Sequence, residues 1–127
     1  MIPILLAAAL GASPPIADMR WHRRILLVAA PRADDPRITG QRKALAGWDA
    51  EARARDLTTV EVVGAHVEGS SDTAPALRKR YRLPPNRFVA ILIGKDGGEK
   101  MRFAAPIAAE TLAATIDAMP MRRAGQR

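Results

Sequence analysis

Two short runs of apolar residues, at 25–30 and 88–93, constrain the fold of this chain more than any other feature. Neither run alternates with polar residues, so each predicts a strand that is buried on both faces of a sheet. The β-branched, mostly apolar stretch at 57–63 predicts another strand. Helices must cover both faces of a sheet built from such strands, as they do in α/β proteins.

The segments between these strands carry helix and turn signals. Asp35 before Pro36 predicts a helix start, because an aspartate caps free N–H groups and proline suits the first helical position. Apolar residues that recur on one helical face extend this helix to residue 52. The other expected elements are a loop at 64–73, a helix at 74–81, a tight turn at 95–98, a returning strand at 100–104 and a helix from 106 to 120.

The resulting order is strand, helix, strand, helix, strand, hairpin strand and helix. It predicts an α/β fold, namely a thioredoxin-like sandwich with a mixed four-stranded sheet and flanking helices. Strands joined through helices imply right-handed crossovers and a mostly parallel sheet, to which the last hairpin adds one antiparallel strand. With 127 residues, one such domain can bury enough surface to fold without a metal or a disulfide.

The beginning of the chain has the pattern of an export signal. Residues 2–9 are apolar and uncharged, too few for a membrane-spanning helix of about 20 residues, and small residues follow them. We therefore predict a signal peptide at 1–12, cleaved near Gly11 or Ala12, and a periplasmic or secreted product. A short leader at 13–20, the domain at 21–120 and a basic tail at 121–127 would follow. No lysine or arginine precedes the apolar run, so a buried N-terminal helix or strand is the alternative.

Four segments carry a family resemblance: Ala-Pro-Arg-Ala-Asp-Asp-Pro-Arg at 30–37, Leu-Pro-Pro at 83–85, Leu-Ile-Gly-Lys-Asp-Gly-Gly at 92–98 with Lys100, and Ile-Asp-Ala-Met-Pro-Met-Arg-Arg at 116–123. Through them, from Trp21 to the C-terminus, the chain resembles a bacterial thioredoxin-like domain family of unknown function. That family is related to the DUDES domains of animal secreted and matrix proteins such as the sushi-repeat proteins. The resemblance implies a thioredoxin-like fold and an exported setting, and it brings no established activity.

The chain departs from true thioredoxins at the residues that perform their chemistry. Thioredoxins carry Cys-x-x-Cys where the first strand meets the first helix, and here that junction reads Ala-Pro-Arg-Ala-Asp-Asp at 30–35. Val89 stands where thioredoxins have a cis-proline. Because the chain contains no cysteine, it has neither an attacking nor a resolving thiolate. Its composition excludes thiol–disulfide exchange and cysteine peroxidase activity.

The net charge of +7 raises the possibility of an anionic partner. Arg78, Lys79 and Arg82, with Arg80 and Arg87 nearby, form the densest basic stretch, and residues 78 and 82 lie one helical turn apart. Nucleic-acid binding is disfavoured because stacking rings are scarce. We predict an unknown protein or polyanion as the partner. The alternatives are a basic face that is only solvated and a general compositional bias towards arginine.

The start of the first helix is a second candidate site, formed by Arg32, Asp35 and Arg37. A helix N-terminus attracts anions through its free N–H groups and its dipole, and the two arginines add positive charge. Asp34 and Asp35 already place negative charge there, so helix capping with solvent-facing arginines is the competing interpretation.

Two further pairs complete the candidate binding residues. Lys95 and Asp96 precede two glycines and could be taken for a phosphate loop, but the spacing favours a hairpin turn. Arg122 and Arg123 could contact the last helix's carbonyls or a partner. We predict no catalytic residues, no metal site and no cofactor. The expected function is that of a redox-inactive binding module. The alternative is an enzyme of non-thiol chemistry with a small anionic ligand at the first helix N-terminus.

Overall fold

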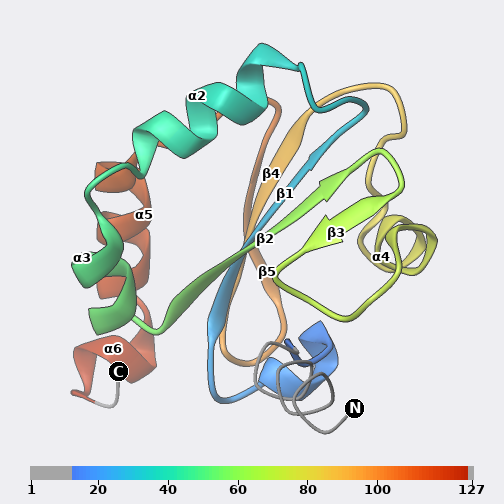
Figure 1. Cartoon of the computed structure of the whole chain (residues 1–127). Helices are drawn as coiled ribbons and strands as arrows, with labels where there is room; N and C mark the ends of the chain where they lie inside the picture. The colour runs from blue at the N-terminus through green and yellow to red at the C-terminus, as the bar shows by residue number, and fades with distance from the viewer. Residues whose placement is uncertain (1–12, 126–127) are drawn as a thin grey trace, which may run out of the picture.

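A five-stranded sheet with helices on both faces organises the chain in the computed structural model, which describes residues 13–125 (Figure 1). The strands, in the spatial order β3-β2-β1-β4-β5, are β1 (Arg24–Ala30), β2 (Leu57–Val63), β3 (His66–Glu68), β4 (Val89–Ile93) and β5 (Glu99–Phe103). The helices are the 3-10 helix η1 (Ile16–Met19) and the α-helices α2 (Pro36–Ala44), α3 (Asp49–Ala54), α4 (Ala74–Tyr81), α5 (Ala109–Asp117) and α6 (Pro120–Arg123).

The two apolar runs form the centre of the sheet. Every residue of β1 and of β4 is buried, as expected for strands that are covered on both faces. Successive side chains of a strand point to opposite faces. Leu27 and Ile91 accordingly belong to one hydrophobic core, whereas Leu26 and Leu92 belong to the other.

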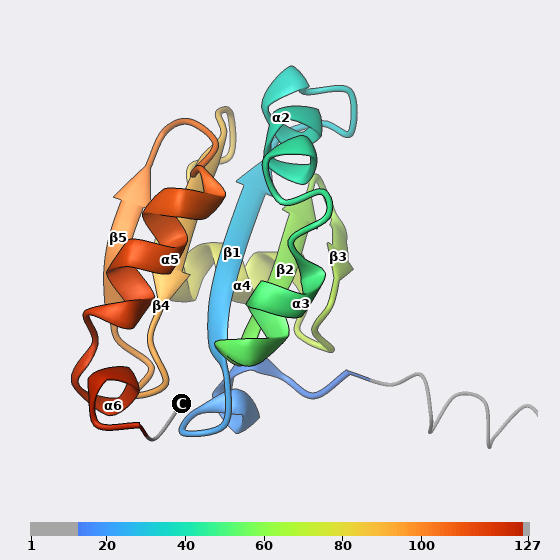
Figure 2. The ribbon, with the colours of Figure 1, turned by 90° about the vertical axis from the view of Figure 1, so that its left-hand side faces the viewer.

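Each face of the sheet has its own core, and Figure 2 shows α2, α3 and α5 together on one side with α4 on the other. Side chains of α4 and η1, including Leu77, Ile16 and Met19, fill the first core. Side chains of α2 and α5, including Ile38 and Leu112, fill the second. The arrangement is therefore a helix–sheet–helix sandwich.

The prediction of four strands and a mostly parallel sheet is wrong in two respects that share one cause. Residues 66–68, expected within a loop, form β3, which pairs antiparallel with β2. The chain thus turns back before α4, and the connection through α4 starts β4 at Val89, beside Ala29 at the end of β1. As a result β4 runs antiparallel to β1, and only β1 and β2 are parallel.

The single helix expected from residue 35 to 52 is divided into α2 and α3. Helix α2 ends at Ala44, and Gly47, in the turn that follows, adopts a left-handed backbone conformation with φ +76° that redirects the chain into α3. The expected apolar face persists, since Leu45, Trp48 and Ala52 still pack against the same core as Ile38. The last helix begins at Ala109 rather than 106 and ends at Asp117, and Pro120 opens the short helix α6.

The packed unit includes residues that precede the expected start at Trp21. Ile16 and Met19 are both 3% exposed and belong to the first core, so η1 is part of the domain rather than a leader outside it. The predicted signal peptide at 1–12 lies outside the described residues. Within 13–125, no helix is long and apolar enough to cross a membrane.

Candidate functional site

The junction between β1 and α2 is occupied by carboxylates of the chain itself. Asp35 caps α2: its Oδ1 accepts a hydrogen bond from the backbone N–H of Arg37 at 2.9 Å. The Arg37 guanidinium also lies 3.8 Å from this carboxylate. Arg32 pairs with Asp34 at 3.0 Å on the exposed surface. Both predicted arginines therefore contact neighbouring aspartates, as in the capping interpretation.

A hollow beside this junction also contains paired charges. Arg42 of α2 binds Glu61 of β2 through two hydrogen bonds, of 3.0 and 2.6 Å. Hydrogen bonding to Glu61 raises the pKa of the Arg42 guanidinium. In β3, the Nε2 of His66 lies 2.7 Å from the Oε1 of Glu68, and both residues line the same hollow. Within the described range, no three acidic, histidine or cysteine side chains are placed to hold a metal ion.

The predicted basic stretch on α4 separates into one inward-turned arginine and an exposed group. Arg78 donates from Nη2 to the carbonyl oxygen of Gly64 at 2.9 Å, and it makes longer contacts with those of Pro84 and Ala30 at 3.4 and 3.5 Å. It thereby ties α4 to the turn between β2 and β3. The remaining basic side chains are exposed, and we call them the α4 basic face: Lys79, Arg80, Arg82 and Arg87.

Tyr81 belongs to the core side of α4 and offers no open ring. Its ring packs against the first core, and the Arg80 guanidinium lies over it, 5.1 Å from the centroid. Its hydroxyl is buried with no hydrogen-bond partner among the described residues, and burial raises the pKa of this phenol. Arg102 of β5 donates to the carbonyl oxygens of Tyr81 and Arg82 at 2.6 and 3.4 Å, which satisfies the end of α4.

Lys95 and Asp96 form a hairpin turn, as the spacing favours. The Oδ1 of Asp96 accepts from the backbone N–H of Gly98 at 2.9 Å, while its Oδ2 pairs with Lys100 at 2.9 Å. Hydrogen bonding to Lys100 is the main cause that lowers the pKa of the Asp96 carboxyl. Lys95 is only 7% exposed, and its ammonium group pairs with Asp56 at 2.9 Å. Neither side chain is arranged as in a phosphate-binding loop.

The predicted arginines near the C-terminus differ in their contacts. Arg122 donates to the carbonyl oxygen of Ala54, at the end of α3, at 2.9 Å and also contacts Asp117 at 3.3 Å. Arg122 therefore binds a free carbonyl oxygen at the end of α3, whereas the sequence analysis expected it to bind those at the end of the last helix. Arg123 is exposed and forms no ion pair within residues 13–125.

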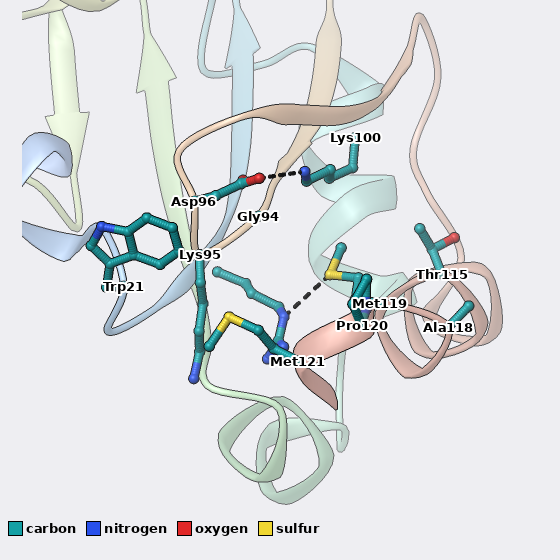
Figure 3. A pocket seen from close by; sticks show the side chains of 11 residues that line it. Trp21, Gly94, Lys95, Asp96, Lys100, Thr115, Ala118, Met119, Pro120 and Met121 are labelled. Atoms are coloured by element: carbon teal, nitrogen blue, oxygen red, sulfur yellow. Dashed lines mark hydrogen bonds and ion pairs between the residues drawn. The ribbon is translucent and has the colours of Figure 1, made fainter. Parts of the chain in front are cut away.

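A cavity that the sequence did not indicate lies at the opposite end of the sheet from the β1–α2 junction (Figure 3). It has a volume of about 450 Å³ and is bounded by Trp21, by the turn after β4, and by the end of α5 with the start of α6. Met119 and Met121 line it, and Arg24 at the beginning of β1 contributes to its wall. Residues from three separate segments, 21–24, 94–100 and 115–121, meet here, which is why no local sequence pattern could have found the cavity.

Three comparisons place this arrangement among known proteins. The chain is 24% identical over 130 residues to "Coiled-coil domain-containing protein 80" of Danio rerio, a match that covers 85% of this chain and spans only 15% of that protein. Its structure is similar to that of a mutant of peroxiredoxin 6 of Arenicola marina, with a TM-score of 0.53 and 16% identity over 80% of this chain and 63% of that one. This likeness confirms the expected thioredoxin-like α/β fold. A family model described as a domain of unknown function (DUF4174) matches residues 15–125, nearly the whole chain, and the chain therefore belongs to that family.

Proposed function

We propose that this domain is an exported, redox-inactive thioredoxin-like module that binds a polyanion through the α4 basic face. The observation that carries the proposal is a grouping of exposed cations that form no internal ion pair. The ion pairs formed within residues 13–125 involve none of Lys79, Arg80, Arg82 and Arg87. By contrast, the arginines at 32, 37, 42, 55, 102 and 122 all lie against carboxylates.

The chemistry of the surface favours a partner with a high density of negative charge. Stable protein–protein interfaces have aromatic or apolar anchors at their centre. Within the described part of the chain, the exposed large apolar side chains are Trp21 and Phe103, and neither lies on α4. Without such an anchor, most of the binding energy must come from charge, as it does for sulfated or carboxylated glycans.

Nucleic acid is disfavoured as the polyanion. Proteins that bind single strands stack bases on exposed aromatic rings. Tyr81, the aromatic residue within the basic stretch, is covered by Arg80 and packs against the core, so it offers no such platform.

No observation favours the alternative of a non-thiol enzyme with a small anion at the start of α2. Such an anion would meet the carboxylates of Asp34 and Asp35, and the Asp35 side chain already accepts a hydrogen bond from a free N–H of that helix. The repulsion and the competition for the same donor both oppose binding.

The test compares two charge-reversed variants of equal net charge on immobilised heparin. In Lys79→Glu/Arg82→Glu the reversals lie on the α4 basic face, and in Arg37→Glu/Lys43→Glu they lie on α2. We expect the wild type to be retained at low salt. A plot of log affinity for heparin against log salt concentration has a negative slope. For the α4 variant we expect the magnitude of this slope to be smaller by about 2, one for each lost contact between a cation and heparin.

Three outcomes would refute the assignment: no retention of the wild type, equal losses in both variants, or a larger loss in the α2 variant. Retention on immobilised poly-glutamate but not on heparin would instead indicate an acidic protein as the partner. Arg78 stays unchanged in both variants, because its guanidinium holds the turn between β2 and β3.

Export to the periplasm or the cell exterior is part of the proposal and rests on the apolar run at 2–9 with the small residues after it. The bacterial type of the domain and its relation to the DUDES domains rest on the resemblance alone. Fusing residues 1–20 to alkaline phosphatase, which is active only after export, tests the targeting. Phosphatase activity is expected, and an inactive, cytoplasmic fusion would contradict it.

A further inference from the structure

The cavity at the α6 end of the sheet has the size and lining of a small-molecule site. Its volume of about 450 Å³ lies within the range of about 300–1,000 Å³ that is usual for such sites. Met119 and Met121 form one side, with Ala118 and Pro120 between and beside them, and Trp21 stands on the other side (Figure 3). Methionine side chains adapt to ligands of irregular shape, because they are flexible and polarisable.

Trp21 is held in a costly conformation at the edge of this cavity. Its φ of +70° lies in the left-handed region, which residues other than glycine rarely adopt. The backbone N–H of Trp21 donates to the carbonyl oxygen of Lys95 at 2.6 Å, and this bond fixes the strained segment against the turn after β4. The side chain is nevertheless 55% exposed. Residues held in such conformations cluster at functional sites. The Arg20 guanidinium lies over the Trp21 ring, 5.1 Å from its centroid, and adds a positive charge beside it.

The charged groups that line the cavity carry a surplus of positive charge. They are three cations, Arg24, Lys95 and Lys100, and one carboxylate, Asp96. Lys100 pairs with Asp96 at 2.9 Å. Lys95 pairs with Asp56, and Arg24 donates to the carbonyl oxygen of Arg55 at 2.7 Å and to the sulfur of Met119 at 3.3 Å. With Asp56, the partner of Lys95, included, three cations stand against two carboxylates, which leaves an excess of one positive charge. The apolar walls weaken the screening of this excess by water.

We propose that this cavity binds a small molecule with an apolar, planar body and one anionic group. The body fits between Trp21 and the two methionines, and the surplus of positive charge selects the anion. The site is independent of the α4 basic face, because no residue of that face lines it. It also lies away from the β1–α2 junction, since Arg24 begins β1 and Ala30 ends it.

Two fluorescent probes with the same arylamine framework test the proposal. The anionic probe is 1-anilinonaphthalene-8-sulfonate, and the neutral probe is N-phenyl-1-naphthylamine. We expect saturable binding of one molecule of the anionic probe per folded chain. Energy transfer from Trp21 should accompany it, and the affinity should exceed that of the neutral probe by about tenfold at low salt. Added salt should reduce this preference.

Variants locate the binding site. Trp21→Ala removes one wall and Ala118→Phe fills the cavity, and each should weaken binding of the anionic probe at least about tenfold. Phe103→Ala, which removes the other exposed aromatic side chain, should leave the affinity unchanged. Lys79→Glu/Arg82→Glu should also bind the probe as the wild type does, which separates this site from the polyanion surface. Circular dichroism and cooperative unfolding confirm that each variant is folded.

Four results would overturn the proposal: no saturable binding by the folded wild type, equal or tighter binding of the neutral probe, unchanged affinity in both cavity variants, or an equal loss in Phe103→Ala.

Discussion

Replacing Arg78 by alanine tests whether this arginine stabilises the fold rather than binding a partner. Its guanidinium donates to the carbonyl oxygen of Gly64 at 2.9 Å and approaches those of Pro84 and Ala30 at 3.4 and 3.5 Å. The contacts join α4, the turn after β2 and the end of β1. Loss of the side chain would leave these three segments without their common donor.

The magnitude follows mainly from the shortest contact. A hydrogen bond from a charged donor contributes about 1.5–3 kcal/mol, and the two longer contacts contribute little at their distances. The carbonyl oxygen of Ala30 keeps its bond from the Gly64 N–H at 3.1 Å. The site is partly buried, so water can replace some of the lost interaction. We therefore expect Arg78→Ala to lower the free energy of unfolding by about 2 kcal/mol.

Urea unfolding followed by circular dichroism measures this loss. With a slope of about 2 kcal/mol per molar urea, the midpoint should fall by about 1 M while the slope stays constant. Lys79→Ala is the matched control, because it removes an exposed cation from the neighbouring position on α4 and should change stability by less than about 0.5 kcal/mol. A midpoint in Arg78→Ala equal to that of the wild type, or equal shifts in the two variants, would refute the structural role.

Two further predictions concern contacts that join distant segments. Gln41, 2% exposed, exchanges hydrogen bonds of 3.0 and 2.7 Å with the backbone of Ile107, so Gln41→Leu should cost about 2–5 kcal/mol in urea unfolding by leaving both backbone groups buried and unpaired. A loss below about 1 kcal/mol would contradict this. Asp117 has a lowered pKa in the folded state, chiefly because Arg55 donates to it. Its contribution is present above the ordinary pKa of about 4 and is lost as the pH falls through the lower folded-state value. Asp117→Asn should therefore flatten the dependence of unfolding free energy on pH below about pH 4, and parallel profiles of variant and wild type would show that the interaction is without effect.

The parts of the fold that the sequence predicted are those set by local pattern and burial. The buried runs around Leu27 and Ile91 became the two central strands. The start of α2 was found because a capping side chain precedes proline there, and the Asp35 carboxylate does accept a hydrogen bond from the Arg37 N–H. Such patterns involve only a few neighbouring residues, so they can be recognised in the sequence without knowledge of the tertiary structure.

The strand β3 could not be predicted in this way, because its stability comes from its neighbour. Its three residues alternate His66, Val67 and Glu68, with only the valine packed against the core. A strand this short has no pattern of its own beyond one apolar residue. It forms because Val67 pairs with Val62 of β2, and missing it led directly to the wrong direction of β4.

Arg78 and Asp96 lie in the helix and the hairpin turn that the sequence predicted, whereas Arg122 and Arg123, expected in a tail, lie in α6. The directions of the side chains were not available from spacing. Arg78 and Arg82 lie one turn apart, yet Arg78 turns towards Gly64 while Arg82 is exposed at the end of α4. Arg78 points inward because the turn between β2 and β3 places the Gly64 carbonyl oxygen within its reach, and the sequence does not show where that turn lies. The cavity behind Trp21 was missed for the same reason, because its walls come from segments almost 100 residues apart.

The distribution of charge explains why function should be sought away from the usual working edge of this fold. Reactive thiolates are stabilised at helix N-termini by free N–H groups and the helix dipole. In this chain the Asp35 carboxylate already accepts a hydrogen bond from the Arg37 N–H at that place, and Arg32 and Asp34 pair with each other beside it. A ligand anion there would have to displace a charge that is part of the chain. The cations of the α4 basic face form no ion pair within residues 13–125, so the proposed polyanion would meet no such obstacle there.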